Sequence, residues 1–138
     1  MPPEGPIVRS TRQWLGHARD DLELAENAVR EGTRPFLRDA ASHSQQSAEK
    51  ALKAFLTGHD APFPRIHDLE DIGARCVAAD ASLQALVDRV AQLSQYAWRF
   101  RYPGEPYEPT AEEVRQALQF ARETFEAILS RLPAEVHP

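Results

Sequence analysis

Eleven prolines limit where helices can form in this chain, because a proline inside a helix removes a hydrogen bond and clashes with the preceding turn. They occupy positions 2, 3, 6, 35, 62, 64, 103, 106, 109, 133 and 138. Between them, apolar residues recur at three- or four-residue spacing, and no stretch alternates apolar and polar residues as a strand does. The sequence therefore predicts an all-α protein, an antiparallel helical bundle of about five helices.

Capping residues and glycines predict the ends of the first two helices. Ser10, followed by Gln13, forms a capping box at which the first helix is expected to begin, and Gly32 is expected to end it. A second helix is expected from about Pro35, which suits a first helical turn, to Gly58. Many residues on its apolar face are small, so another helix can approach closely.

The same reasoning predicts three further helices. Asp68 can cap a short helix after the proline loop, and Asp80 or Ser82 can cap the next one. Thr110 and Glu113 form a second capping box, which opens a last helix with a continuous apolar face. We expect one domain over residues 11–132, preceded by a flexible segment, 1–10, and followed by a tail, 133–138.

Composition excludes several classes of protein. A net charge of −5 argues against a broad basic face that would hold duplex DNA. The single cysteine, Cys76, cannot form an internal disulfide, and no apolar stretch is long enough to span a membrane. No Cys/His cluster has zinc spacing, and no glycine-rich loop could hold a nucleotide pyrophosphate. We therefore expect a cytoplasmic protein with no metal or cofactor and no membrane association.

Four segments together resemble the HEPN family over about residues 11 to 130. They are Trp14-Leu15-x-x-Ala18-x-x-Asp21-Leu22-x-x-Ala25, the run His43-Ser44-Gln45-Gln46-Ser47-Ala48-Glu49-Lys50-Ala51-Leu52-Lys53-Ala54-Phe55-Leu56, then His67-Asp68-Leu69, and Arg101-Tyr102-Pro103. The resemblance implies a helical bundle, similar to nucleotidyltransferase substrate-binding domains, that forms a homodimer. It also implies a partner, because such proteins are often encoded beside a minimal nucleotidyltransferase in a toxin–antitoxin-like pair.

The resemblance leaves the activity open. Many family members are metal-independent ribonucleases with an Arg-x(4–6)-His motif, whereas others look like non-catalytic or nucleotide-binding modules. In the matching region of this chain, Arg99 and Arg101 are followed by no histidine. We therefore expect a nucleotide- or RNA-binding module acting with the nucleotidyltransferase. The first alternative is a ribonuclease toxin with a non-standard site, in which Arg101 stabilises charge and His43 or His67 is the acid–base group.

A candidate binding site lies on the second helix, where His43, Gln46, Ser47 and Lys50 share one face. If that face meets the loop before the last helix, the two would form a groove suited to a phosphate and a stacked base. The loop would contribute Arg99, Arg101, Tyr102 and Tyr107.

Each of these residues also has a purely structural interpretation. Gln46 with Lys50, and Glu49 with Lys53, have the spacing of ordinary surface pairs. His43 could pack at a helix contact, and His67 could close the loop beside the Asp68 cap. The arginines could satisfy a helix C-terminus, and the tyrosines could belong to the core or to a dimer interface.

The second alternative is a purely structural dimerisation domain. In that interpretation the interface would be the small-residue face of the second helix, which consists of Ser44, Ser47, Ala48, Ala51 and Ala54.

Overall fold

The computed structural model describes residues 4–30, 35–65, 68–97 and 108–138, and within these ranges the chain forms helices and no strands. Five α-helices pack together, which confirms the predicted helical bundle. They are α1 (Pro6–Ala28), α2 (Leu37–Gly58), α3 (Leu69–Ala79), α4 (Gln84–Val90) and α5 (Ala111–Arg131). Three short 3-10 helices accompany them: η1 (Ala81–Leu83), η2 (Ala91–Ala97) and η3 (Ala134–Val136).

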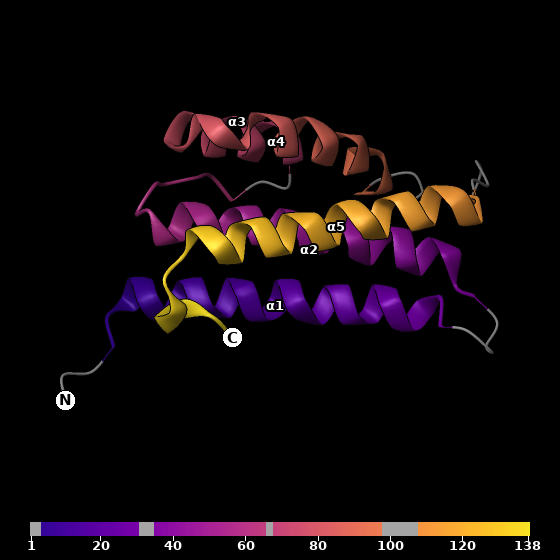
Figure 1. Ribbon diagram of the computed structural model, residues 1–138, viewed down its shortest axis with the longest axis horizontal. Helices are drawn as coiled ribbons and strands as arrows, with labels where there is room; N and C mark the ends of the chain where they lie inside the picture. The colour runs from indigo at the N-terminus through magenta and orange to yellow at the C-terminus, as the bar shows by residue number, and fades with distance from the viewer. Residues whose placement is uncertain (1–3, 31–34, 66–67, 98–107) are drawn as a thin grey trace.

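The helix α2 lies at the centre of the bundle. It contacts α1 most extensively and also packs against α5, α3 and η2, with α1 on one side and the α3–α4 layer on the other (Figure 1). Small side chains on α2 allow this close packing. The small-residue face that was considered as a dimer interface, Ser44, Ser47, Ala48, Ala51 and Ala54, is completely buried within the single chain. That interface is therefore wrong, because helices of the same chain already cover it.

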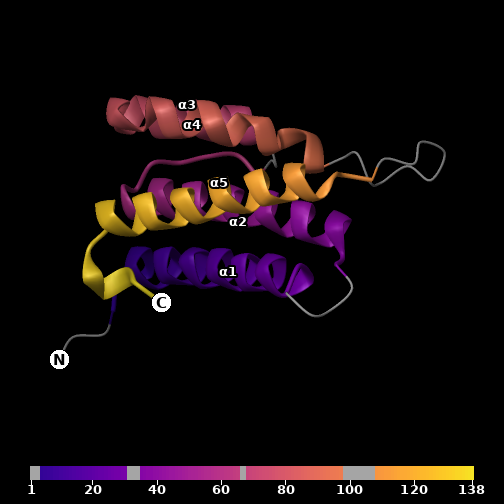
Figure 2. The same cartoon turned by 45° about the vertical axis from the view of Figure 1, so that its right-hand side comes forward.

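The helix directions follow from the path of the chain. Whereas α1 and α2 are antiparallel, α5 runs in the same direction as α2 (Figure 2). The cause is the pair α3 and α4, which carries the chain across the bundle and back to the end where α2 begins. The start of α1 and the end of the chain consequently lie at the same end of the bundle (Figure 1).

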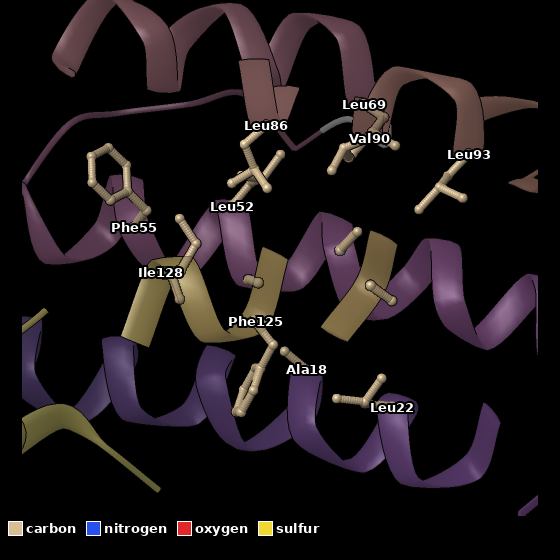
Figure 3. Packing of buried hydrophobic residues seen from close by; sticks show 14 of the residues in the cluster. Ala18, Leu22, Leu52, Phe55, Leu69, Leu86, Val90, Leu93, Phe125 and Ile128 are labelled. Atoms are coloured by element: carbon tan, nitrogen blue, oxygen red, sulfur yellow. The ribbon is translucent and has the colours of Figure 1, made fainter. Parts of the chain in front are cut away.

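Side chains from every layer fill the space between the helices. Leu86, Val90 and Leu93 extend from the α4–η2 segment toward α2 and α5, and Phe125 extends from α5 toward α1 (Figure 3). Every member of the apolar face predicted for the last helix is buried. Its members are Val114, Leu118, Ala121, Phe125, Ile128 and Leu132.

Two predicted helix starts are confirmed. The Asp68 carboxylate accepts hydrogen bonds from the backbone N–H groups of Glu70 and Asp71, at 3.0 and 3.3 Å. At α5, the Thr110 hydroxyl accepts from the N–H of Glu113, and the Glu113 carboxylate accepts from the N–H of Thr110, both at 3.1 Å. These side chains satisfy N–H groups that have no partner within a helix.

The ends of α1 differ from the prediction. The helix begins at Pro6, and Ser10 lies inside it, because a proline in the first turn gives up only an N–H that has no helical partner. It ends at Ala28, and Gly32 lies outside the described residues. Residues 6–10 are thus helical, unlike the flexible segment expected there.

The fourth predicted helix also differs from expectation, and the tail contacts the bundle. Asp80 caps the 3-10 helix η1 and not an α-helix, so the predicted fourth helix consists of η1, α4 and η2 in succession. After α5, Val136 is buried and η3 contacts α1, so residues 134–136 pack onto the bundle. None of the helices in the described ranges combines the length and apolar content that a membrane span requires.

Candidate functional site

A buried carboxylate lies at the contact between α1 and α2. Asp21, on α1, is only 5% exposed, and its two oxygens have different partners on α2. The Nδ1 atom of His43 lies 2.9 Å from Oδ1, and the Nζ atom of Lys50 lies 2.5 Å from Oδ2. A buried charge is costly unless it is paired and hydrogen-bonded. These partners therefore explain how Asp21 is accommodated, and we call the three residues the Asp21 cluster.

The spacing of the sequence builds this cluster. His43 and Lys50 are seven residues apart, which is about two helical turns, so they lie on the same side of α2. Ser47, between them, is completely buried and donates a hydrogen bond to the backbone oxygen of Ala18 at 2.7 Å. That bond joins α1 and α2 one turn from Asp21, so the register of the two helices places the carboxylate between the imidazole and the ammonium group.

The hydrogen bond to Asp21 fixes which nitrogen of the His43 imidazole is the donor. A carboxylate can only accept, so Nδ1 of His43 carries the proton and donates it to Asp21. In the neutral ring, Nε2 then keeps its lone pair. The His43 and Lys50 side chains are 30% and 25% exposed, respectively. The cluster therefore places an imidazole and an ammonium group side by side at the surface, both held from below by the same carboxylate.

Among the other predicted residues, Gln46 is half-buried on the same side of α2, between His43 and Lys50. The remaining candidates, His67, Arg99, Arg101, Tyr102 and Tyr107, lie outside the described residues.

The family model described as the HEPN domain matches residues 11–132, which is most of the chain. The chain belongs to the HEPN family. No curated protein and no solved structure matches it. In this HEPN domain, Asp21 lies in the first of the segments that carried the resemblance, and His43 and Lys50 lie in the second.

Sequence reasoning assigned no role to Asp21. In the sequence it is one of several acidic residues on α1, next to Asp20 and close to Glu23, and such residues usually face solvent. One signal was present: Asp21 falls between Ala18 and Leu22, which belong to the buried stripe of the helix. A carboxylate on the flank of such a stripe needs a cation or hydrogen-bond donors on the neighbouring helix.

The ion pair between Glu49 and Lys53, which was considered as a surface pair, is buried in the HEPN domain. Lys53 and Glu49 lie 3.5 Å apart, and each side chain is only 5% exposed. The Lys53 ammonium also lies 5.3 Å from the centre of the Trp14 ring and 6.0 Å from that of Phe63, where aromatic rings attract cations. The surface interpretation was wrong because α2 is surrounded by other elements.

Within the described part of the HEPN domain, no group of three or more His, Cys, Asp or Glu side chains could hold a metal ion. The Asp21 cluster contains only two metal-ligating side chains, and a lysine occupies the third position. The thiol of Cys76 is buried, and burial raises its pKa to about 12. A thiol in this environment stays protonated and is a poor nucleophile.

Proposed function

We propose that this HEPN protein is a homodimeric nucleotide- or RNA-binding module that acts with a separately encoded minimal nucleotidyltransferase, in a toxin–antitoxin-like pair. The observation that carries the binding part of the proposal is the Asp21 cluster. Its buried carboxylate holds the ammonium group of Lys50 and the ring of His43 at the surface. The partnership draws its support from membership of the HEPN family.

The chemistry of the cluster suits a phosphate group. An ammonium has three N–H donors, and the bond to Asp21 uses one of them, so Lys50 can donate others to phosphate oxygens. Charge-assisted hydrogen bonds of this kind are short and strong. The amide of Gln46, on the same side of α2, adds a neutral donor and acceptor for a sugar or a base.

A purely structural role explains the cluster less well. Buried ion pairs contribute little net stability compared with apolar residues of similar size, because the loss of hydration offsets the attraction. If the cluster only joined α1 to α2, apolar side chains would do so at least as well. The presence of a lysine and a histidine at the edge of the contact therefore favours a role in binding a ligand that needs their charge and hydrogen bonds.

The test is the affinity of the protein for a fluorescein-labelled single-stranded RNA and for AMP, comparing Lys50→Ala with Arg115→Ala. Each variant loses one positive charge, but Arg115 lies on α5 with a 71% exposed side chain. A charge-assisted hydrogen bond contributes about 1.5–3 kcal/mol. We therefore expect Lys50→Ala to weaken binding at least about tenfold, while Arg115→Ala binds as the wild type does. Equal affinities of the two variants for both ligands would contradict the proposed site.

The ribonuclease alternative is favoured by one specific observation. Asp21 orients the His43 ring so that the lone pair of Nε2 is available to accept a proton, as the aspartate of a catalytic triad orients its histidine. If this alternative holds, the wild-type protein should cleave RNA in the presence of EDTA. The cleavage should be lost in His43→Asn and kept in His17→Asn. RNA left intact by the wild-type protein would refute it and leave the binding module.

A further inference from the structure

The outward side of α1 carries a shallow groove that is separate from the Asp21 cluster. In both views α1 lies at the edge of the bundle, with α2 and α5 on one side of it (Figure 1, Figure 2). A groove of about 580 Å³ lies along the helix. The α1 residues that line it include Arg9, Arg12, Gln13, Gly16 and Arg19, and we call it the arginine groove. In a chain with a net charge of −5, three positive charges are thus gathered in one place.

Two residues of the arginine groove weaken the helix without serving its packing. Gly16 lies in the middle of a helix of 23 residues, where glycine is unfavourable, and a side chain added there would meet nothing within 4 Å. Arg9 lies in the first turn, where the helix dipole disfavours positive charge, and α1 has no acidic residue in that turn. The stability of α1 therefore explains neither residue. Both suit an anionic ligand, because a bare stretch of helix backbone lets it approach closely.

The contacts of Arg12 show which chemistry the groove accepts. Two terminal nitrogens of its guanidinium group donate to the two oxygens of the Glu4 carboxylate, each at 2.7 Å. Arginine forms the same two-point contact with phosphates. Glu4 is exposed, so a ligand from solvent can compete with its carboxylate. The side chain of Arg19 is also exposed, and its ion pair with Asp20, at 4.0 Å, leaves most of its donors for a ligand.

The length and the lining of the groove favour a strand of phosphates. Arg9 and Arg19 are ten residues apart, which is about 15 Å along the helix and exceeds the reach of one phosphate. A protein partner is usually anchored by large apolar or aromatic side chains, whereas the apolar residues that line this groove are two prolines, Pro6 and Pro138. A duplex would need a longer basic face, and the next residue on this side of α1 is acidic, Glu23.

We propose that the arginine groove binds the phosphate backbone of a single-stranded RNA. The inference rests on the proposed function and narrows its ligand from a nucleotide or RNA to a strand of several nucleotides. Gly16 and Asp21 are five residues apart, or about 140° around α1, so a single nucleotide on the Asp21 cluster does not reach the groove. A strand passes around the helix over the exposed Gln13 and places further phosphates on the arginines.

The test compares the affinities of variants for a fluorescein-labelled single-stranded RNA and for AMP. The groove variant is Arg9→Ala with Arg19→Ala, and the matched control is Arg75→Ala with Arg115→Ala, which removes two exposed arginines of α3 and α5. We expect the groove variant to bind RNA at least about tenfold more weakly than the wild type does, and to bind AMP equally well. The control should bind both ligands as the wild type does.

The salt dependence of RNA binding gives a readout that a structural role of the arginines would not change. For each phosphate contact that is lost, the slope of the logarithm of affinity against the logarithm of salt concentration should become shallower by about 0.7. The groove variant should show this change, and the control should not.

Two single variants test the groove without removing an arginine. Gly16→Gln fills its floor at constant charge, so it should weaken RNA binding while the free energy of unfolding does not fall. Glu4→Gln should bind RNA more tightly than the wild type does, because it removes a carboxylate from among the arginines.

The outcomes separate the arginine groove from the proposed function. Equal RNA affinities of the groove variant and its control would overturn the groove, while weaker AMP binding by Lys50→Ala would leave the proposed function standing. Wild-type protein that binds neither ligand would overturn both. Poly-glutamate that binds the groove more tightly than RNA does at the same salt concentration would assign it to an acidic protein segment, and would also overturn the inference.

Discussion

Replacing Asp21 with asparagine tests whether the buried carboxylate holds the α1–α2 contact together. The substitution keeps the size of the side chain and removes the charge that His43 and Lys50 share, at 2.9 and 2.5 Å. Hydrogen bonds to charged groups contribute about 1.5–3 kcal/mol each. Because the His43 and Lys50 side chains are 30% and 25% exposed, respectively, their polar groups regain part of their hydration. We therefore expect unfolding free energy to fall by about 2 kcal/mol.

The assay is reversible thermal and urea unfolding followed by circular dichroism. At roughly 3–5 °C per kcal/mol for a chain of this length, Asp21→Asn should lower Tm by about 6–10 °C. Asp20→Asn is the matched control, because its 64% exposed carboxylate lies 4.0 Å from its partner, Arg19. It should change the unfolding free energy by less than about 0.5 kcal/mol. An equal loss of stability in the two variants would refute the reasoning.

Three further predictions concern packing, the buried thiol and a helix cap. Gly73→Ala should destabilise the protein by about 1–3 kcal/mol, since the added Cβ would lie 2.6 Å from a methyl group of Val87. A Cβ added at Gly16 would have no atom within 4 Å, so Gly16→Ala should stabilise the protein by up to about 1 kcal/mol in the same urea titrations. Cys76 should resist iodoacetamide in the native protein and react once urea unfolds the chain; rapid labelling of the native protein at pH 8 would contradict its burial. Because burial raises the pKa of this thiol to about 12, its contribution to stability should fall as pH rises from about 9 toward 12. Thr110→Ala should lower the free energy of unfolding by about 1 kcal/mol by loss of the cap, whereas Thr110→Ser should behave like the wild type. Equal Tm values for the two variants would argue against the cap.

Local signals in the sequence predicted most of the fold. The caps at Asp68 and Thr110 act through hydrogen bonds within one turn, so the sequence alone contains all that determines them. The start of α1 was misplaced because two local signals competed, and Pro6 as the first helical residue prevailed over the capping box at Ser10.

The parts that sequence reasoning missed all depend on tertiary packing. Glu49 and Lys53 have the spacing of a surface pair, and only the central position of α2 buries them. The small side chains of α2 predicted a close helix contact correctly, but not whether the neighbour belonged to the same chain. Asp21 could not be distinguished from its acidic neighbours, because its role depends on the register between α1 and α2.

The most direct test of the proposed site is an NMR titration of the histidine side chains with AMP, using the five imidazole groups as probes. The resonances of His43, assigned by their loss in His43→Asn, should shift and saturate as the nucleotide binds, and the shift should disappear in Lys50→Ala. Saturable shifts confined to His17 or His137, with His43 unchanged, would show that the nucleotide binds elsewhere and would contradict the account.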